Sequence, residues 1–446
     1  MTIENDSATP WSPTQWSKAE SWSRDCLAAF QKKALATQLA YVEANSAFYR
    51  ARFAAAGFRA ADFREPADLA RLPLTTKQDY MAALDDGPPW GSALACDPAA
   101  VRRLHFSSGT TSRPTPDAWT GPDLARWADL YGRAAYSQGV RRGDVFQCLF
   151  SYPWFVGGLG ATAAFERIGC MVIPGGSGDT ERQIETLFAY GTTTIMATPS
   201  FAAHLAEVAQ RMGRDLRQSK VRHIGVGGEP GAGVPATRAR LEALWDAKVF
   251  DCYGSLEFQP IAWDCAAQAG GHLVEDFAHV EVIDPATGAA VPDGTPGMLV
   301  LTHLDKQAFP LVRWATGDIV VRDSRPCACG RTHARLPGGV RGRADDMIVI
   351  RGVNLFPTAV EDVVRAMPGL ADEYRIILDE TVRDPATGFP TGIRLQVEAA
   401  ADAPADIGHR LADAIRTKLL VRATVEVLAP MALERFTHKA KRLVRQ

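Results

Sequence analysis

The run His105-Phe-Ser-Ser-Gly-Thr-Thr-Ser-Arg-Pro-Thr115 decides how the rest of the chain is interpreted. Its hydroxyl groups can donate hydrogen bonds to phosphate oxygens, Gly109 lets the backbone approach a ligand closely, and Arg113 supplies positive charge. The G-x-x-x-x-G-K-[ST] spacing is absent, so a P-loop NTPase is disfavoured. Taken alone, the run also suits a polar surface turn, because Ser, Thr and Gly are common in turns. Its meaning therefore depends on the rest of the chain.

The segments around this run predict an α/β fold. Apolar residues at helical spacing predict helices over residues 14–60, with Gly57 as their stop. From about residue 100 to 255, short apolar runs alternate with helical stretches, which is typical of parallel strands with crossover helices. The predicted strands are Val145–Phe150, Cys170–Ile173 and Thr194–Ala197, and the predicted helices are Thr180–Ala189 and Phe201–Met212.

The second half of the chain shows two further patterns. Between residues 273 and 325, strand-like runs are separated by turns, which predicts an antiparallel sheet or a small barrel. A smaller unit follows a boundary near residues 342–345. Its predicted elements are a strand Met347–Ile350, a helix Ala359–Ala366, strands Tyr374–Leu378 and Ile393–Glu398, a helix Ile407–Leu419 and a basic tail.

Bulk properties indicate the class of partner. The chain has 446 residues, 46% of them hydrophobic, and a formal net charge of -2. Such a charge does not attract polyanions, so nucleic acid and anionic membranes are disfavoured and small molecules are favoured. The acidic start of the sequence lacks the features of a signal peptide, and no stretch approaches roughly 18 uninterrupted apolar residues. We expect a cytoplasmic protein.

Further motifs follow the first run in a fixed order: Asp251-Cys-Tyr-Gly-Ser-Leu-Glu257, Arg313-Trp-Ala-Thr-Gly-Asp318, the segment 342–357 and Lys439-Ala-Lys-Arg442. Together they resemble the adenylate-forming superfamily, and most closely the phenylacetate-CoA ligase family. Asn45–Arg50 and Leu72–Lys77 extend the resemblance over nearly the whole chain. It implies a large N-terminal adenylation domain with parallel sheets and a small barrel-like β subdomain, residues 1–342. A small mobile α+β C-terminal domain, residues 343–446, would follow.

The resemblance also implies roles for individual residues. Glu257 would bind Mg²⁺, Tyr253 would lie beside the adenine and Asp318 would hold the ribose hydroxyls. The catalytic residues would be Glu257 and Lys439, whose ammonium would stabilise the charge that develops as a carboxylate attacks the α-phosphate of ATP. The implied ATP- and AMP-binding positions are Ser107, Ser108, Gly109, Thr110, Thr111, Gly228, Glu229, Pro230, Tyr253, Gly254, Asp318 and Arg343.

Two segments of the sequence differ from the family pattern. His438 stands where the family usually has Gly before the lysine, and Lys441 is close enough to compete with Lys439 for the catalytic role. Ser112-Arg113 replaces the usual Gly-Lys, which keeps the positive charge but changes its geometry.

Asp345 resembles the hinge of the mobile domain, and Gly352 lies in the loop that would pass the pantetheine arm of CoA.

Three cysteines and a histidine could hold a structural zinc ion. Cys265, His272, Cys327 and Cys329 supply three thiolates and an imidazole, enough for a closed tetrahedral site. A similar Cys and His set occurs in sequences of the phenylacetate-CoA ligase family. The C-x-C spacing is tighter than the usual C-x2-C, so the alternative of unrelated thiols and a surface histidine stays open. Cys252 is expected to be a small buried residue and not a further ligand.

The segment Tyr152-Pro-Trp-Phe-Val-Gly-Gly-Leu-Gly160 matches the part of the family that lines the acid pocket. Its aromatic side chains suit a planar ring, although aromatics of this kind are often simply core. Thr162-Ala163 stands where relatives often show His-Tyr, which leaves room for an acid larger than phenylacetate. The predicted pocket residues are Tyr152, Trp154, Phe155, Gly157 and Gly158.

These features predict an AMP-forming ligase that activates an aromatic acid and transfers it to CoA. The acid would be phenylacetate-like, indoleacetate-like or a substituted benzoate. ATP, Mg²⁺ and CoA would be its cofactors and co-substrates, and a homodimer is a family expectation. One alternative is an enzyme that loads a carrier-protein pantetheine. Another is a nucleotide-binding relative that has lost catalysis, as His438 and Ser112 allow.

Overall fold

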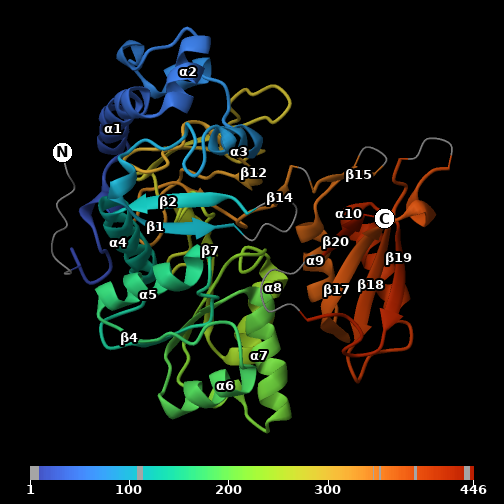
Figure 1. Cartoon of the computed structure of the whole chain (residues 1–446). Helices are drawn as coiled ribbons and strands as arrows, with labels where there is room; N and C mark the ends of the chain where they lie inside the picture. Colours follow the sequence, from blue (N-terminus) through green and yellow to red (C-terminus); the bar gives the residue numbers. More distant parts are fainter. Residues whose placement is uncertain are drawn as a thin grey trace. The chain divides into compact units, whose positions relative to one another are not determined.

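The computed structural model describes residues 10–107, 114–344, 346–350, 353–385, 389–435 and 442–445. The chain divides into two compact units, and each combines helices with strands (Figure 1). The first unit comprises the residues up to Gly176 together with Cys252–Pro337. The second comprises Ser177–Asp251 and the residues from Gly338 onward. The predicted domain division between residues 342 and 343 stays a prediction.

The first unit begins with helices, as the sequence predicts. The hydroxyls of Ser23 and Ser46 accept hydrogen bonds from the first turns of α1 and α2. Gly57 follows α2 with a φ of 59°, a left-handed conformation typical of helix ends. Apolar side chains of both helices form a buried core with Val312. The elements are η1 Lys18–Ser21, α1 Arg24–Asn45, α2 Ala47–Ala55, η2 Ala60–Asp62, η3 Pro66–Arg71 and α3 Lys77–Asp85.

A β-hairpin carries the Ser/Thr/Gly run, which is the name used below for residues 107–115. After η4 (Pro98–Ala100), β1 (Val101–Phe106) pairs antiparallel with β2 (Pro116–Thr120), and the run connects the two strands. Helix α4 (Gly121–Gln138) begins directly at the end of β2, where Thr120 and Asp123 form a capping box. The hairpin is therefore anchored at one end by a long helix.

Parallel strands occur in both units, as predicted. In the first unit, β3 pairs in parallel with β4, and α5 is the crossover between them. In the second, β5, β6 and β7 pair in parallel, with α7 and α8 as crossovers. The predicted strands and helices of this region are confirmed to within two residues at each end. The elements are β3 Val145–Cys148, α5 Val156–Ile168, β4 Met171–Ile173, α6 Thr180–Ala189, β5 Thr194–Ala197, α7 Pro199–Arg211, η5 Leu216–Gln218, β6 His223–Val226, α8 Pro235–Trp245 and β7 Lys248–Tyr253.

The antiparallel strands predicted for residues 273–325 are confirmed. β11 pairs with β10 on one side and with β12 on the other. Short strands beside the end of β7 complete this part of the first unit. The elements are β8 Ala262–Trp263, β9 Gly271–Leu273, β10 Ala278–Ile283, β11 Pro296–His303, β12 Trp314–Val321 and β13 Arg335–Leu336.

The C-terminal part of the second unit is a mixed α+β structure. β17 and β18 are antiparallel, while β19 and β20 join them in parallel; β17, β18 and β19 lie side by side in Figure 1. The predicted strand at Tyr374 begins earlier, at Leu370, and β19 and β20 were not predicted. The elements are β14 Gly342–Arg343, β15 Ile348–Ile350, β16 Val353–Leu355, α9 Pro357–Arg365, β17 Leu370–Leu378, η6 Glu380–Val382, β18 Ile393–Ala399, α10 Ile407–Leu419, β19 Ala423–Leu428 and β20 Leu443–Arg445. In the part of the chain that the structure describes, no helix has the length and apolar character needed to cross a bilayer.

The packing of α5 against α4 depends on a glycine. A Cβ atom at Gly160 would lie 2.1 Å from the buried ring of Trp127, which stacks on Trp119 with ring centroids 4.7 Å apart. We therefore expect Gly160→Ala to lower the free energy of unfolding by about 1–3 kcal/mol, as overpacking of a core does. Gly121→Ala is the control, because a Cβ there meets nothing within 4 Å. Urea unfolding measures both, and equal stabilities would contradict the packing argument.

Candidate functional site

The Ser/Thr/Gly run begins and ends with mutual hydrogen bonds. The Ser107 amide donates to the Thr115 carbonyl, and the Thr115 amide donates to the Ser107 hydroxyl, each at 2.9 Å. Phe106, one residue earlier, donates its amide to the carbonyl of Trp154 at 2.8 Å. The run is thus tied to the predicted acid-pocket segment. The remaining predicted phosphate-binding positions, Ser108, Gly109, Thr110 and Thr111, lie outside the described residues, as does Arg113.

A cavity of about 530 Å³ opens at this junction, within the first unit. Two predicted pocket residues, Trp154 and Phe155, line it together with Ser107. Its other walls come from residues that the sequence analysis did not assign to the acid pocket, and most of them are apolar. They are Leu84, Asp85, Pro88, Pro89, Phe106, Pro114 and Pro116.

Trp154 has an unusual conformation for a large side chain. Its φ is 70°, in the left-handed region, and its side chain is 70% exposed. The ring meets the ring of Phe106 edge-on, with centroids 5.5 Å apart. A backbone of this kind costs about 1–2 kcal/mol for an L-residue, so its surroundings hold it in place. The strained residue forms part of the cavity wall.

Tyr152 is not among the residues that line the cavity. Its hydroxyl forms a 2.8 Å hydrogen bond with Thr162, and burial raises the pKa of the phenol, which is therefore neutral. A Cβ at Gly158 would lie 3.0 Å from the Tyr152 ring, and one at Gly157 would lie 3.3 Å from Phe150. The two glycines thus let aromatic rings pack on the start of α5. The five predicted pocket residues separate into a cavity pair, Trp154 and Phe155, and a group packed on the helix.

The structure brings together two of the predicted nucleotide-binding residues. The Tyr253 hydroxyl donates to the carboxylate of Asp318 at 2.5 Å, although the two residues are 65 positions apart. The Asp318 amide donates to the Thr316 hydroxyl, which in turn donates to the Leu299 carbonyl at 2.8 Å. Gly254 follows Tyr253, and a Cβ there would lie 2.7 Å from the side chain of Gln259.

Glu257 is a largely buried residue whose carboxylate suits a cation. The residue is 8% exposed, and no described residue gives its carboxylate a hydrogen bond or an ion pair. Carboxylate oxygens that no described side chain occupies are available to a hard cation. Glu257 therefore fits a ligand of Mg²⁺, which takes one or two carboxylates together with phosphate oxygens.

The other predicted nucleotide-binding residues lie in the second unit. Gly228, with a φ of 88°, follows β6 and precedes Glu229 and Pro230. The Ser200 hydroxyl donates to the Glu229 carboxylate at 2.5 Å, and burial raises the pKa of that carboxyl group. Arg343 lies on β14. Five further residues discussed above lie outside the described residues: Asp345, Gly352, His438, Lys439 and Lys441.

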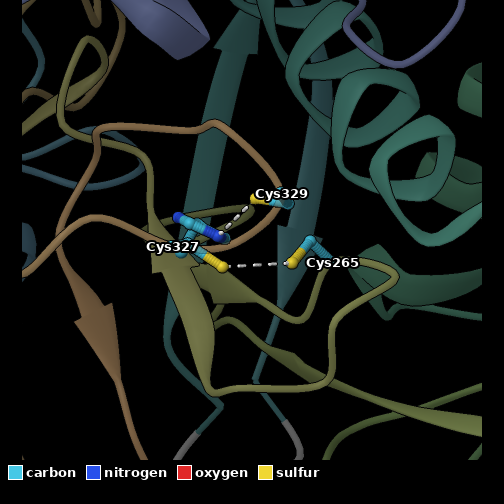
Figure 2. A group of neighbouring side chains, drawn as sticks. Cys265, Cys327 and Cys329 are labelled. Carbon is cyan, nitrogen blue, oxygen red and sulfur yellow. Dashed lines mark hydrogen bonds between the residues drawn. The ribbon is translucent and has the colours of Figure 1, made fainter.

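The four predicted zinc ligands converge. Cys265 precedes β9, His272 lies on β9, and Cys327 and Cys329 come from the turn that precedes β13. Their ligand atoms all lie within 4.8 Å of one another. Figure 2 shows the three cysteine side chains pointing toward a common centre. Cys265 and Cys327 have sulfurs 3.9 Å apart, and the Cys329 sulfur is 3.4 Å from Nε2 of His272.

These separations suit a tetrahedral ion. Zn–S and Zn–N bonds of ordinary length place two sulfurs about 3.8 Å apart, and a sulfur and a nitrogen about 3.6 Å apart. His272 Nδ1 lies 3.1 Å from the His333 carbonyl, which can only accept, so Nδ1 carries the proton and Nε2 is available to a metal. Cys252 is buried, as expected, and accepts a hydrogen bond from Gln138.

Comparison with known proteins identifies the family of the chain. The AMP-binding enzyme family matches residues 27–303, and the AMP-binding enzyme C-terminal domain matches residues 352–446. A phenylacetate-coenzyme A ligase of Aromatoleum evansii is 36% identical and covers 97% of each chain. That of Thermus thermophilus is 35% identical over 88% of each chain. The chain belongs to the phenylacetate-CoA ligase family.

A solved relative has the same fold. A crystal structure of 2-hydroxyisobutyryl-CoA ligase in complex with 2-HIB-AMP superposes with a TM-score of 0.92 at 28% identity, covering 98% of this chain and 94% of the other. The α/β fold class is thereby confirmed. As a member of the phenylacetate-CoA ligase family, the chain is an AMP-forming acid–CoA ligase.

The sequence did not predict most of the residues that form the cavity wall. Pro88 and Pro89 follow α3, and nothing in their spacing indicates that they line a cavity together with the hairpin of β1 and β2. It also missed His303, whose side chain bonds the backbone of Glu257. Contacts between residues far apart in the sequence produce no repeating pattern of apolar residues, so sequence patterns cannot predict them.

The strain at Trp154 leads to a stability prediction. Trp154→Gly should be at least as stable as Trp154→Ala, by up to about 1 kcal/mol, because glycine adopts a positive φ without steric cost. The control pair is Met171→Gly and Met171→Ala in β4, where alanine should be the more stable. Chemical unfolding measures all four variants. If alanine is clearly the more stable at position 154 as well, the backbone there is not strained.

Proposed function

We propose that this ligase activates an aromatic carboxylic acid larger than phenylacetate, such as indoleacetate or a substituted benzoate. The observation that carries the proposal is the aromatic-walled cavity at the start of the Ser/Thr/Gly run. The acid and Mg-ATP would give an acyl-AMP and pyrophosphate. The CoA thiolate would then attack the acyl carbon and release AMP. Phenylacetate-coenzyme A ligases are among the relatives, which supports an aryl acid as substrate.

The volume and lining of the cavity support a large aromatic group. At about 530 Å³ it falls within the range of about 300–1,000 Å³ typical of small-molecule sites. Phe106, Trp154 and Phe155 offer ring faces and edges to a planar substrate. Ser107 lies at the same cavity, so an acid held there would have its carboxylate beside the run assigned to the phosphates. Thr162, which stands where the resemblance to the family implies a histidine, forms a hydrogen bond with the Tyr152 hydroxyl.

Adenylation would use the groups around Asp318 and Glu257. Asp318, held by Tyr253 and Thr316, would accept hydrogen bonds from the ribose hydroxyls. Mg²⁺ on Glu257 would neutralise phosphate charge, and Lys439 would stabilise the charge that develops at the α-phosphate. Rotation about Asp345 would then bring the loop of Gly352 to the acyl-AMP for the second step.

An acid panel tests the proposal. ATP–pyrophosphate exchange and acyl-CoA formation should give kcat/KM values for indoleacetate and substituted benzoates at least tenfold above those for phenylacetate. Acetate, 2-hydroxyisobutyrate and long fatty acids should be poorer substrates. One extra or missing methylene in a hydrophobic pocket is worth about 1–3 kcal/mol, or roughly 10–200-fold in kcat/KM, so a difference of a whole ring allows this selectivity. A preference for an aliphatic acid would refute the aromatic pocket.

The same assay separates the alternatives. Free CoA and a carrier protein bearing pantetheine are offered as acceptors for the acyl-AMP, and CoA should be the better acceptor. Lys439→Ala should abolish exchange, with Lys441→Ala as the matched control that retains it. Exchange that survives Lys439→Ala but not Lys441→Ala would transfer the catalytic role to Lys441. The homodimer implied by the family stays a prediction.

We also propose that Cys265, His272, Cys327 and Cys329 bind one structural Zn²⁺. The convergence of their ligand atoms and the orientation of His272 support this. Four protein ligands leave no open position, so the ion would stabilise the fold and take no part in catalysis. It would connect the β8–β9 region to a turn 62 residues further along the chain.

Metal analysis of the purified protein tests the zinc site. We expect one zinc per chain in the wild type and in Cys252→Ala, whose thiol is buried elsewhere. Cys327→Ala with Cys329→Ala should lose the metal and unfold at a lower temperature, because ligand binding to the native state adds stability. Zinc retained by the double variant, or absent from the wild type, would contradict the assignment.

A further inference from the structure

We propose that His303 is a positioning residue that fixes the backbone of Glu257 and thereby the placement of the metal-binding carboxylate. The inference rests on the proposed role of Glu257 as the Mg²⁺ ligand. His303 is the last residue of β11 and has no exposed surface. It is 46 positions from Glu257 in sequence, and its side chain contacts the two residues at positions 257 and 258.

The hydrogen bonds of the ring define its tautomer. The Leu311 amide donates to Nδ1 at 3.0 Å, and a backbone N–H can act only as a donor, so Nδ1 is unprotonated. The proton is therefore on Nε2, which donates to the Glu257 carbonyl at 3.1 Å. Burial lowers the pKa of His303 well below its ordinary value, which keeps the ring neutral. Both ring nitrogens are satisfied in this one state.

Aromatic contacts hold the same ring in place. His303 stacks on Phe258 with centroids 3.7 Å apart and planes 6° apart. Phe277 meets it edge-on at 5.4 Å. Because Phe258 directly follows Glu257, His303 holds this part of the chain twice, once through the carbonyl and once through the neighbouring ring. The turn is closed locally as well, since the Ser255 amide donates to the Phe258 carbonyl at 2.9 Å.

Two residues of strand β11 therefore hold parts of the candidate nucleotide site. At its end, His303 holds Glu257. Four residues earlier, the Leu299 carbonyl accepts from Thr316, whose hydroxyl binds the Asp318 amide. The proposed metal ligand and the proposed ribose ligand are thus both fixed to one strand. A loose carbonyl at Glu257 would let the carboxylate move relative to Asp318, so metal binding would weaken while the fold persisted.

Two amide replacements separate this role from general stability. His303→Gln places an amide N–H near the position of Nε2 and can keep the bond to Glu257. His303→Asn places an oxygen near Nδ1 and can keep only the bond from Leu311. Both lose the stacked ring, so urea unfolding should show similar losses of stability. Only His303→Asn should lose the positioning of Glu257.

The readouts are metal binding and metal dependence. Electron paramagnetic resonance measures the Kd of Mn²⁺ in the presence of α,β-methylene-ATP, and ATP–pyrophosphate exchange measures half-saturation by Mg²⁺. We expect both constants to rise about tenfold in His303→Asn and less than threefold in His303→Gln, since one hydrogen bond in a buried site is worth about a factor of ten. Equal constants in the two variants would overturn the inference.

Glu257→Ala distinguishes failure of this inference from failure of the proposed function. If that variant leaves the metal constants unchanged, the proposed role of Glu257 is wrong. If it raises them but His303→Asn does not, only the role of His303 is wrong. Should neither His303 variant fold, histidine-labelled wild type gives a direct test by ¹⁵N NMR. The spectrum should contain the signals of a ring that carries its proton on Nε2 and that bound Mn²⁺ broadens. If none of the nine histidines gives such signals, the inference is overturned.

Discussion

The antiparallel pairing of β11 with β10 and β12 is the constraint on which the candidate nucleotide site depends. This ladder aligns β12 so that Asp318 is held through Thr316 by the Leu299 carbonyl. It also places His303 where its ring reaches Glu257 and Phe258. A slip of the register by one residue would turn these side chains to the opposite face. Motifs more than 40 positions apart in the sequence thus share one rigid support.

The cavity depends on a different long-range arrangement. The hairpin of β1 and β2 brings Ser107, Pro114 and Pro116 together, and the bond from the Phe106 amide to the Trp154 carbonyl adds the segment before α5. Gly160 lets α5 approach Trp127 of α4 closely, which fixes the helix that follows the cavity wall. The proposed substrate cavity thus has in its wall a strained aromatic residue, Trp154, whose carbonyl is held by Phe106 at the end of β1.

Much of the architecture could be predicted because its signals are local. Helices α6 and α10 and strand β5 have the predicted bounds, since amphipathic spacing and capping residues lie within each segment. The order of the motifs in the sequence indicated the family, and the four predicted zinc ligands converge although the chain separates them by up to 64 positions. The walls at Pro88 and Pro89 and the contacts of His303 could not be predicted, because they arise only when distant segments pack. β19 was missed because its alternation of polar and apolar residues follows a helix with little turn signal between them.

The central claim is that an aromatic acyl-adenylate occupies the site beside Ser107. Affinity for stable acyl-sulfamoyl-adenosine analogues, measured by titration calorimetry, tests it without dependence on turnover. The account predicts that the indoleacetyl analogue binds more tightly than the phenylacetyl analogue, and that both bind at least tenfold more tightly than the 2-hydroxyisobutyryl analogue. If the 2-hydroxyisobutyryl analogue binds as tightly as the aromatic ones, the account is contradicted.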